Sequence, residues 1–187
     1  RPETAEFLTL LREQTERLAQ MTKTLLEMSN LRQVARNERI QLAPMIEEIF
    51  TDLAPLSDKL GITLTAEGDG MMTGSDALIY RLIFNLTENA VKYNRPGGSV
   101  RVSVTQELEK LLLRVSDTGC GIPEDALQKI FTGSYEKSAA PVDGTRSNMG
   151  IGLSVCAAIV KAHGSEITAE NRKGGGAVFR FSLERGG

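Results

Sequence analysis

The 187-residue chain has the length of one ordinary domain with an appendage, and its 41% hydrophobic and 25% charged residues are typical of a folded globular protein. Its 22 basic and 24 acidic residues give a net charge of −2, without the basic excess that marks a nucleic-acid-binding protein. Two cysteines without a Cys-x-x-Cys motif and a single histidine give no sign of a zinc site or a disulfide framework, so a reducing, cytosolic setting is the default.

The first thirty residues carry a heptad stripe. Gln14 fills one polar slot, and the apolar positions are Phe7, Leu11, Leu18, Met21, Leu25 and Met28. A stripe this narrow needs a partner helix, although packing on its own domain is the alternative. No apolar run is long enough for a membrane helix. Because the chain opens inside a charged periodic segment without a signal peptide, we expect it to be part of a longer protein.

The remaining elements alternate between helices and strands. A polar break at residues 36–39 predicts a linker, after which helices are expected at 44–60, 75–93, 123–131 and 150–163, and strands at 62–66, 71–72, 99–105, 111–117, 165–170 and 177–183. Gly61 is placed to end the first of these helices, and Ser75 or Asp76 to cap the second. Residues 132–149 have no apolar period and predict a long mobile loop, and a loop of this length in a compact domain is usually functional or disordered.

The helix expected at 75–93 carries two different surfaces. Its apolar stripe is Leu78, Ile79, Leu82, Ile83, Leu86 and Ala90. Asn85, Glu88, Asn89 and Lys92 share the helical spacing on another surface, where their oxygen atoms could serve as ligands to a hard cation such as Mg²⁺. A solvated polar face is the alternative.

Two Gly-rich pieces follow. Asp117 ends a predicted strand and is followed by Gly119 and Gly121, which allow a sharp turn and the close approach of a ligand. The Asp117 carboxylate could accept a hydrogen bond from the amino group of adenine, or it could simply cap a tight turn. Gly150 and Gly152 open a helix whose backbone N–H groups could bind phosphate, or they could serve close packing. The chain contains neither a P-loop nor a dinucleotide fingerprint.

The order of these pieces resembles the nucleotide-binding domain of sensor histidine kinases, within the GHKL superfamily of gyrase, chaperone, kinase and mismatch-repair ATPases. The matching segments are 85–93 (N box), 117–121 (G1 box), 130–131 (F box) and 150–153 (G2 box), followed by the endings 162–167 and 176–181. The resemblance implies an α+β, Bergerat-type ATP-binding fold: a two-layer sandwich of a mixed, largely antiparallel sheet with helices on one face, preceded by a long amphipathic helix. Residues 1–39 would then be the second helix of a dimerisation hairpin and its linker, and 40–187 the catalytic domain.

The resemblance also implies the site. Asn89 would coordinate Mg²⁺ on the ATP phosphates with help from Asn85, Lys92 would contact a phosphate, and Glu88 would orient the phosphoryl acceptor. The implied nucleotide-binding residues are Asn85, Asn89, Lys92, Tyr93, Asp117, Gly119, Gly121, Ile122, Lys137, Arg146, Gly150, Ile151, Gly152 and Leu153. Among them, Lys137 and Arg146 lie in the long loop, from which they could reach the γ-phosphate.

By the same resemblance, the intact protein would transfer the γ-phosphoryl group of ATP to a histidine located before Arg1, and from there to an aspartate of a response regulator receiver domain. It would form a homodimer through the helical hairpin, as the cytoplasmic domain of a membrane-anchored sensor. The only histidine, His163, is expected instead to cap a helix and interact with its dipole. The chain departs from the family at residues 146–149, which are Arg, Ser, Asn and Met where many members have further glycines. A serine kinase of the anti-sigma type and a non-catalytic nucleotide-sensing module are the alternatives.

Overall fold

The computed structural model describes residues 1–132 and 149–186, and the chain divides into two units, Arg1–Gln33 and Val34–Gly187. The first unit is helix α1 (Pro2–Asn30) followed by a short 3₁₀ turn, Leu31–Gln33. The predicted heptad stripe lies on this one continuous helix, and Phe7, Leu11, Leu18, Met21 and Leu25 are exposed. None of the helices in the described ranges is both long and apolar enough to cross a membrane.

The second unit is built around a five-stranded sheet with the strand order β2-β4-β5-β7-β6. Its strands are β2 (Thr63–Glu67), β4 (Ser99–Gln106), β5 (Lys110–Asp117), β6 (Thr168–Asn171) and β7 (Ala177–Glu184). Strand β2 runs parallel to β4, and the other neighbours are antiparallel. The mixed, largely antiparallel sheet predicted from the sequence is confirmed.

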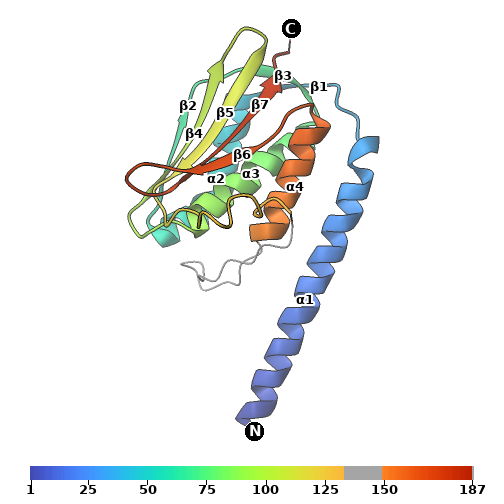
Figure 1. Ribbon diagram of the computed structural model, residues 1–187, viewed down its shortest axis with the longest axis vertical. Helices are drawn as coiled ribbons and strands as arrows, with labels where there is room; N and C mark the ends of the chain where they lie inside the picture. The colour runs from blue at the N-terminus through green and yellow to red at the C-terminus, as the bar shows by residue number, and fades with distance from the viewer. Residues whose placement is uncertain (133–148, 187) are drawn as a thin grey trace. The chain divides into compact units, whose positions relative to one another are not determined.

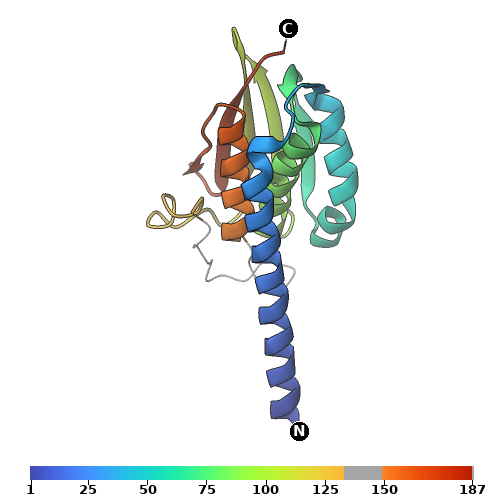
Figure 2. The same ribbon diagram turned by 90° about the vertical axis from the view of Figure 1, so that its right-hand side faces the viewer.

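Three helices cover one face of this sheet (Figures 1 and 2). They are α2 (Leu42–Leu60), α3 (Asp76–Lys92) and α4 (Met149–Ala162), and α3 contacts both of the others. Helix α2 ends where predicted, because Gly61 adopts a left-handed conformation with φ 67°. Its N-terminus is held by Asp69, whose Oδ1 accepts the N–H of Ala43 at 2.9 Å.

The core lies between the sheet and the helices. Each strand alternates, so that one set of side chains is buried under the helices: Val100, Val102, Leu111, Leu113, Val115, Phe179, Phe181 and Leu183. The apolar stripe of α3 faces them, and Ile79, Leu82, Ile83 and Leu86 are each 0% exposed. Burying a side chain of this size contributes roughly 1.5–3 kcal/mol, so the stripe fixes which surface of α3 remains for polar residues.

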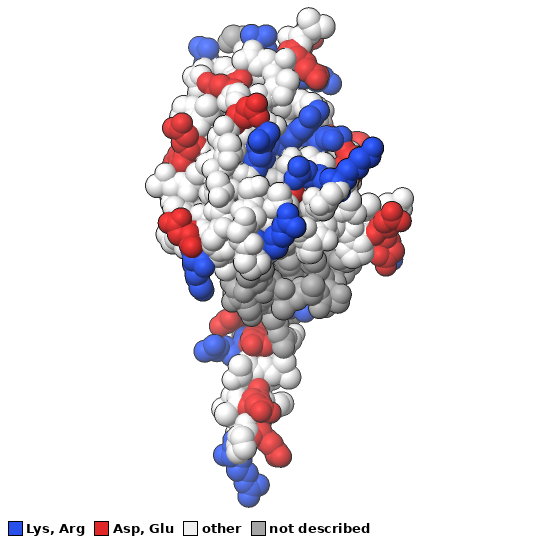
Figure 3. Space-filling model, turned by 90° about the vertical axis from the view of Figure 1, so that its left-hand side faces the viewer, with Lys and Arg blue, Asp and Glu red and all other residues white. Residues whose placement is uncertain are grey.

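The other face of the sheet stays hydrated through its charged side chains. Arg101 forms an ion pair with Glu67 at 3.7 Å, and Arg180 with Glu170. Arg114 lies opposite Arg180 in the strand register. Figure 3 shows Lys and Arg side chains gathered in the upper half of the view. The period-2 alternation thus separates a dry face from a wet one.

Two predicted elements differ in the structure. The segment 36–39 is not entirely a polar break, because strand β1 (Glu38–Gln41) pairs with β3 (Met71–Gly74) and buries Ile40 against it. The helix predicted at 123–131 was wrong: the segment forms successive turns, in which backbone bonds such as Ala126 N–H to the Pro123 carbonyl span three residues. Ala126 and Ile130 are buried in these turns.

Candidate functional site

The polar surface of α3 is positioned by a capped N-terminus and a buried stripe. Ser75 caps the helix as predicted, with its Oγ accepting the N–H of Leu78 at 3.4 Å. Near the other end of the helix, the carboxylate of Glu88 and the ammonium of Lys92 form an ion pair at 3.5 Å, and both side chains are about one-third exposed (32% and 27%). The pair leaves its charges close to water and to any ligand that binds there.

Asn89 has a buried amide without a protein partner. Its Nδ2 is inaccessible to water and has no hydrogen bond within residues 1–132 and 149–186. Leaving such a group unpaired costs about 1–3 kcal/mol, and folded proteins avoid it except where a ligand or strain explains it. Because a carboxamide can present either its oxygen or its nitrogen after rotation, Asn89 fits a site completed by a bound group.

Asp117 lies at the end of β5 and is only 8% exposed. Its Oδ1 accepts two backbone N–H groups, from Gly119 at 2.8 Å and from Ala177 at 3.2 Å. These bonds fix the rotamer of the carboxylate without using positive charge. A buried acceptor held in this way can select a ligand by one hydrogen-bond donor.

The loop after Asp117 packs on the C-terminal end of α3. A Cβ atom added to Gly119 would lie 2.3 Å from the carbonyl oxygen of Tyr93, so no other residue permits this approach. The N–H of Cys120 also points to that carbonyl, at 3.4 Å. The structure therefore brings Asp117 to the C-terminal end of α3, which carries Asn89 and Tyr93.

The sequence interpretation missed Asn94 and Thr118, which join α3 to the sheet. Asn94 is 3% exposed; its Nδ2 donates to the carbonyl of Ser99 at 2.9 Å, and its Oδ1 accepts the hydroxyl of Thr118 at 3.0 Å. Thr118 in turn accepts the N–H of Ser99 at 2.9 Å. Asn94 comes directly after the helix predicted at 75–93 and was given no role, because its partner Thr118 lies 24 positions away.

The Gly-rich start of α4 is described only in part. Gly150 and Ile151 lie within the helix, but their side-chain surroundings are not described, and Lys137 and Arg146 lie outside the described residues. A Cβ added to Gly152 would meet no described atom within 4 Å. Close packing therefore gives no reason for Gly152 among these residues. Leu153 is fully buried in the core, and Ile122 is nearly so, with 5% of its surface exposed.

His163 forms a neutral bridge between two helices. Its Nε2 accepts the N–H of Ser75 at 3.3 Å, so its Nδ1 donates to the carbonyl of Ile159, 2.8 Å away. Burial lowers the pKa of His163, and the charge of Arg36 lowers it further, against the opposing effect of the Ile159 bond. The expected cap on the last turn of α4 is present, but an interaction of a charged imidazolium with the dipole is not.

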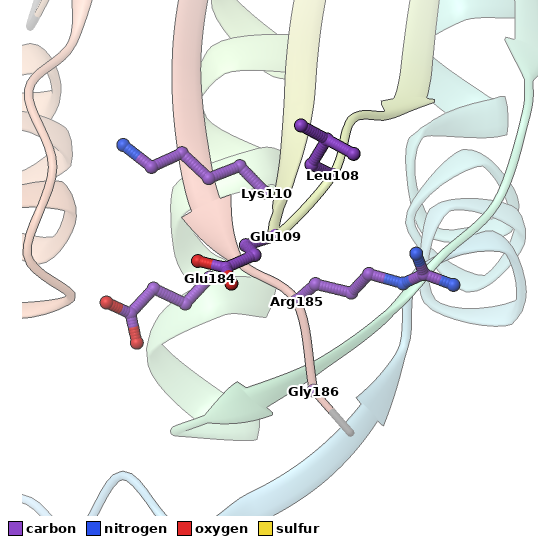
Figure 4. Close-up of a pocket in the computed structure, with 6 residues that line it drawn as sticks. All are labelled: Leu108, Glu109, Lys110, Glu184, Arg185 and Gly186. Carbon is purple, nitrogen blue, oxygen red and sulfur yellow. The ribbon is translucent and has the colours of Figure 1, made fainter.

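A shallow pocket of about 550 Å³ lies at the opposite end of β5. Its lining residues are Leu108, Glu109, Lys110, Glu184, Arg185 and Gly186. Figure 4 shows that the side chains of Lys110, Glu184 and Arg185 point in different directions instead of converging on a common centre. None of the candidate residues lines this pocket.

The chain is similar to proteins of a known family. Residues 74–187 match the family described as histidine kinase-, DNA gyrase B-, and HSP90-like ATPase. The sensor protein KdpD of Clostridium acetobutylicum is 30% identical over 186 residues, which cover 96% of this chain and 20% of KdpD, so the chain spans only a fifth of that relative.

Solved structures agree in fold. The catalytic domain of histidine kinase ThkA has a TM-score of 0.70 at 26% identity, covering 81% of this chain and 97% of that one. ThkA in complex with the response regulator protein TrrA has a TM-score of 0.75 at 22% identity, covering 96% of this chain and 51% of that one. Together the two solved structures match the sheet and helices described above.

Proposed function

The chain belongs to the histidine kinase-, DNA gyrase B- and HSP90-like ATPase family, and we propose that it is the ATP-binding catalytic part of a two-component sensor histidine kinase. In the longer protein it would transfer the γ-phosphoryl group of ATP to a histidine, for relay to an aspartate of a response regulator. The observation that carries the proposal is the buried Nδ2 of Asn89, which has no partner among the described residues and lies on the helix end that the Asp117 loop contacts.

The residues present support a nucleotide with a magnesium ion. Asn89 would hold the ion, with Asn85 assisting, and Mg²⁺ when bound would neutralise charge between the phosphates. Asp117 would accept the adenine amino group, and Tyr93 would lie beside the adenine and ribose. Lys92 would contact a phosphate.

The remaining assignments complete the pocket. Gly119, Gly121 and Ile122 would form its floor, and Gly150 to Leu153 would bring the start of α4 to the phosphates. No described atom lies within 4 Å of a Cβ atom added to Gly152, which supports this role. Lys137 and Arg146 remain proposed contacts of the γ-phosphate.

Glu88 and Lys92 suggest how binding would prepare transfer. They form an ion pair at 3.5 Å, and because the pair is partly exposed it contributes only about a few tenths of a kcal/mol to stability. When Lys92 moves to a phosphate, Glu88 becomes available to orient the acceptor imidazole. E88Q should therefore lower phosphoryl transfer much more than ATP affinity, measured with the same preparation. Equal transfer by E88Q and the unaltered chain would remove Glu88 from the mechanism.

Phosphoryl transfer in trans tests the function itself. The chain would be mixed with radiolabelled ATP, Mg²⁺ and a separate two-helix peptide that carries a histidine. We expect an acid-labile phosphoryl group on that histidine. Acid-stable label on a serine would indicate a kinase of the anti-sigma type instead, and ATP binding without transfer would indicate a non-catalytic nucleotide sensor.

We further propose the setting of the longer protein. Residues 1–39 would supply the second helix of a dimerisation hairpin and its linker, and 40–187 the catalytic domain. The exposed apolar stripe of α1 supports a helical partner, in a homodimer. A receiver domain would accept the phosphoryl group, and the catalytic domain would be cytoplasmic in a membrane-anchored sensor.

A further inference from the structure

The turn between β6 and β7 reaches the Gly-rich loop that follows β5. Asn171 is the last residue of β6, and its carboxamide bonds to both backbone groups of Ile122: Oδ1 accepts the N–H at 2.7 Å, and Nδ2 donates to the carbonyl at 2.6 Å. Only a carboxamide side chain offers a donor and an acceptor at this spacing. Asn171 therefore holds Ile122 as a neighbouring strand would.

The same turn holds the other end of the loop. Arg172 donates from Nη1 to the carbonyl of Asp117 at 2.8 Å, and the N–H of Ala177 donates to the Asp117 carboxylate at 3.2 Å. A Cβ atom added to Gly176 would lie 1.9 Å from the Asp117 carbonyl oxygen, so the turn sits directly against the strand end. Residues of the β6–β7 turn therefore form hydrogen bonds with both the first residue of the loop, Asp117, and the last, Ile122.

Between these two points the loop contacts the end of α3, where Thr118 bonds to Asn94 and the N–H of Cys120 points to the carbonyl of Tyr93. Gly121 has φ 72°, and a Cβ added there would come within 2.8 Å of Asn171 Oδ1. The path of the loop depends on the two hydrogen bonds from Asn171 to Ile122 and on the left-handed backbone conformation of Gly121. Without the carboxamide, the Ile122 backbone groups would lose both partners.

We propose that Asn171 is a positioning residue for nucleotide binding, which holds the loop 117–122 in the shape that presents the Asp117 carboxylate to the base. The inference rests on the proposed nucleotide function. Asn171 acts through Ile122 and the loop rather than by touching the nucleotide. Its loss changes the shape of the base pocket while the sheet, whose core it does not enter, remains folded.

The first test measures ATP affinity and unfolding temperature for the 187-residue chain and its N171A and N171D variants. N171A should bind ATP about tenfold more weakly, since two backbone hydrogen bonds that shape the loop are lost. N171D keeps the acceptor for the Ile122 N–H but sets a carboxylate oxygen against the Ile122 carbonyl, so its affinity should fall at least as far. N37A, at an exposed asparagine of the segment before β1, is the matched control and should bind normally.

The second test needs no nucleotide. Cys120 lies in the loop and is exposed, whereas Cys156 is buried in α4, so alkylation of the two thiols reports separately on the loop and on global unfolding. In N171A the alkylation rate of Cys120 should rise several-fold, because a loosened loop releases its Sγ from the carbonyls of Tyr93 and Gly121, which lie 3.6 and 3.5 Å away, while Cys156 stays unreactive. In N37A neither rate should change.

The outcomes separate this inference from the proposed function. Absence of ATP binding by the unaltered chain would refute the function, and the Cys120 rates would still decide whether Asn171 shapes the loop. If the unaltered chain binds ATP and N171A binds it equally well, Asn171 is not a positioning residue. An unchanged Cys120 rate, or labelling of Cys156 at the same rate as Cys120, would equally overturn the inference, because the variant would then have left the loop intact or unfolded the domain.

Discussion

Replacing Asp117 by asparagine tests the base pocket with the smallest possible change. The amide oxygen of an asparagine can still accept the N–H groups of Gly119 and Ala177, which lie 2.8 and 3.2 Å from Oδ1 in the native protein. The fold should therefore be retained. What changes is the other end of the group, where an NH₂ donor replaces an anionic oxygen.

The size of the effect follows from two losses. A hydrogen bond to a charged group contributes about 1.5–3 kcal/mol, and a buried donor that faces another donor costs a further 1–3 kcal/mol or so. D117N should thus weaken ATP binding by about 2.5–6 kcal/mol, or at least roughly 50-fold. The affinity for inosine triphosphate, which carries a carbonyl at the same ring position, should fall far less.

Calorimetric titration with both nucleotides checks this, together with the unfolding temperature of each variant. D125N removes the same charge at an exposed aspartate in the turns after the loop, and serves as the matched control. If D117N and D125N bind ATP with equal affinity, the assignment of Asp117 to the base is refuted. A D117N protein that no longer folds would refute the premise that the amide oxygen satisfies both backbone groups.

Three further predictions concern the same region. N89A should leave the unfolding temperature of the nucleotide-free protein unchanged or slightly higher, because a buried unpaired amide is removed, but should abolish the dependence of ATP affinity on Mg²⁺ in titrations with and without a chelator. The pKa of His163 is lowered by burial, so the unfolded state binds more protons than the folded state just below pH 6.5. The contribution of neutral His163 to the free energy of unfolding should therefore be fully present above pH 6.5 and decrease as the pH falls below it. H163Q should lack this decrease when the free energy of unfolding is measured by denaturant titration at pH 5 and pH 8. Alkylation should modify exposed Cys120 but not Cys156, because burial raises the pKa of the Cys156 thiol to about 12. Saturating ATP should slow the alkylation of Cys120, and equal rates with and without ATP would place the nucleotide elsewhere.

The elements that the sequence predicted are those whose signal is local. The helix 75–93, the hairpin of β4 and β5 and the cap at Ser75 each follow from spacing within a few residues, and the structure confirms them. The helix predicted at 123–131 was wrong because the backbone bonds there, such as that from Ala126 N–H to the Pro123 carbonyl, close separate turns. Strand β1 was missed because its partner β3 comes thirty or so residues later.

The same distinction holds for the candidate site. Asn85, Asn89 and Asp117 could be proposed because each sits in a short pattern with its own chemical meaning. Asn94 and Asn171 could not, since their partners Thr118 and Ile122 lie 24 and 49 positions away and no local pattern connects them. An asparagine at the end of a helix or strand has no evident role in the sequence until the structure shows which groups its amide bonds.

This difference indicates how the work of the site is divided. The residues with local patterns are those proposed to touch the ligand, and their chemistry depends on residue type. The asparagines found only in the structure bond to backbone groups, and they fix where the loop 117–122 lies between α3 and the β6–β7 turn. Because that loop rests on glycines rather than on a core of its own, its shape is set from outside, at Tyr93 and Asn94 on one side and at Asn171 on the other. Changes on either side should therefore alter nucleotide affinity without removing any group that contacts the nucleotide.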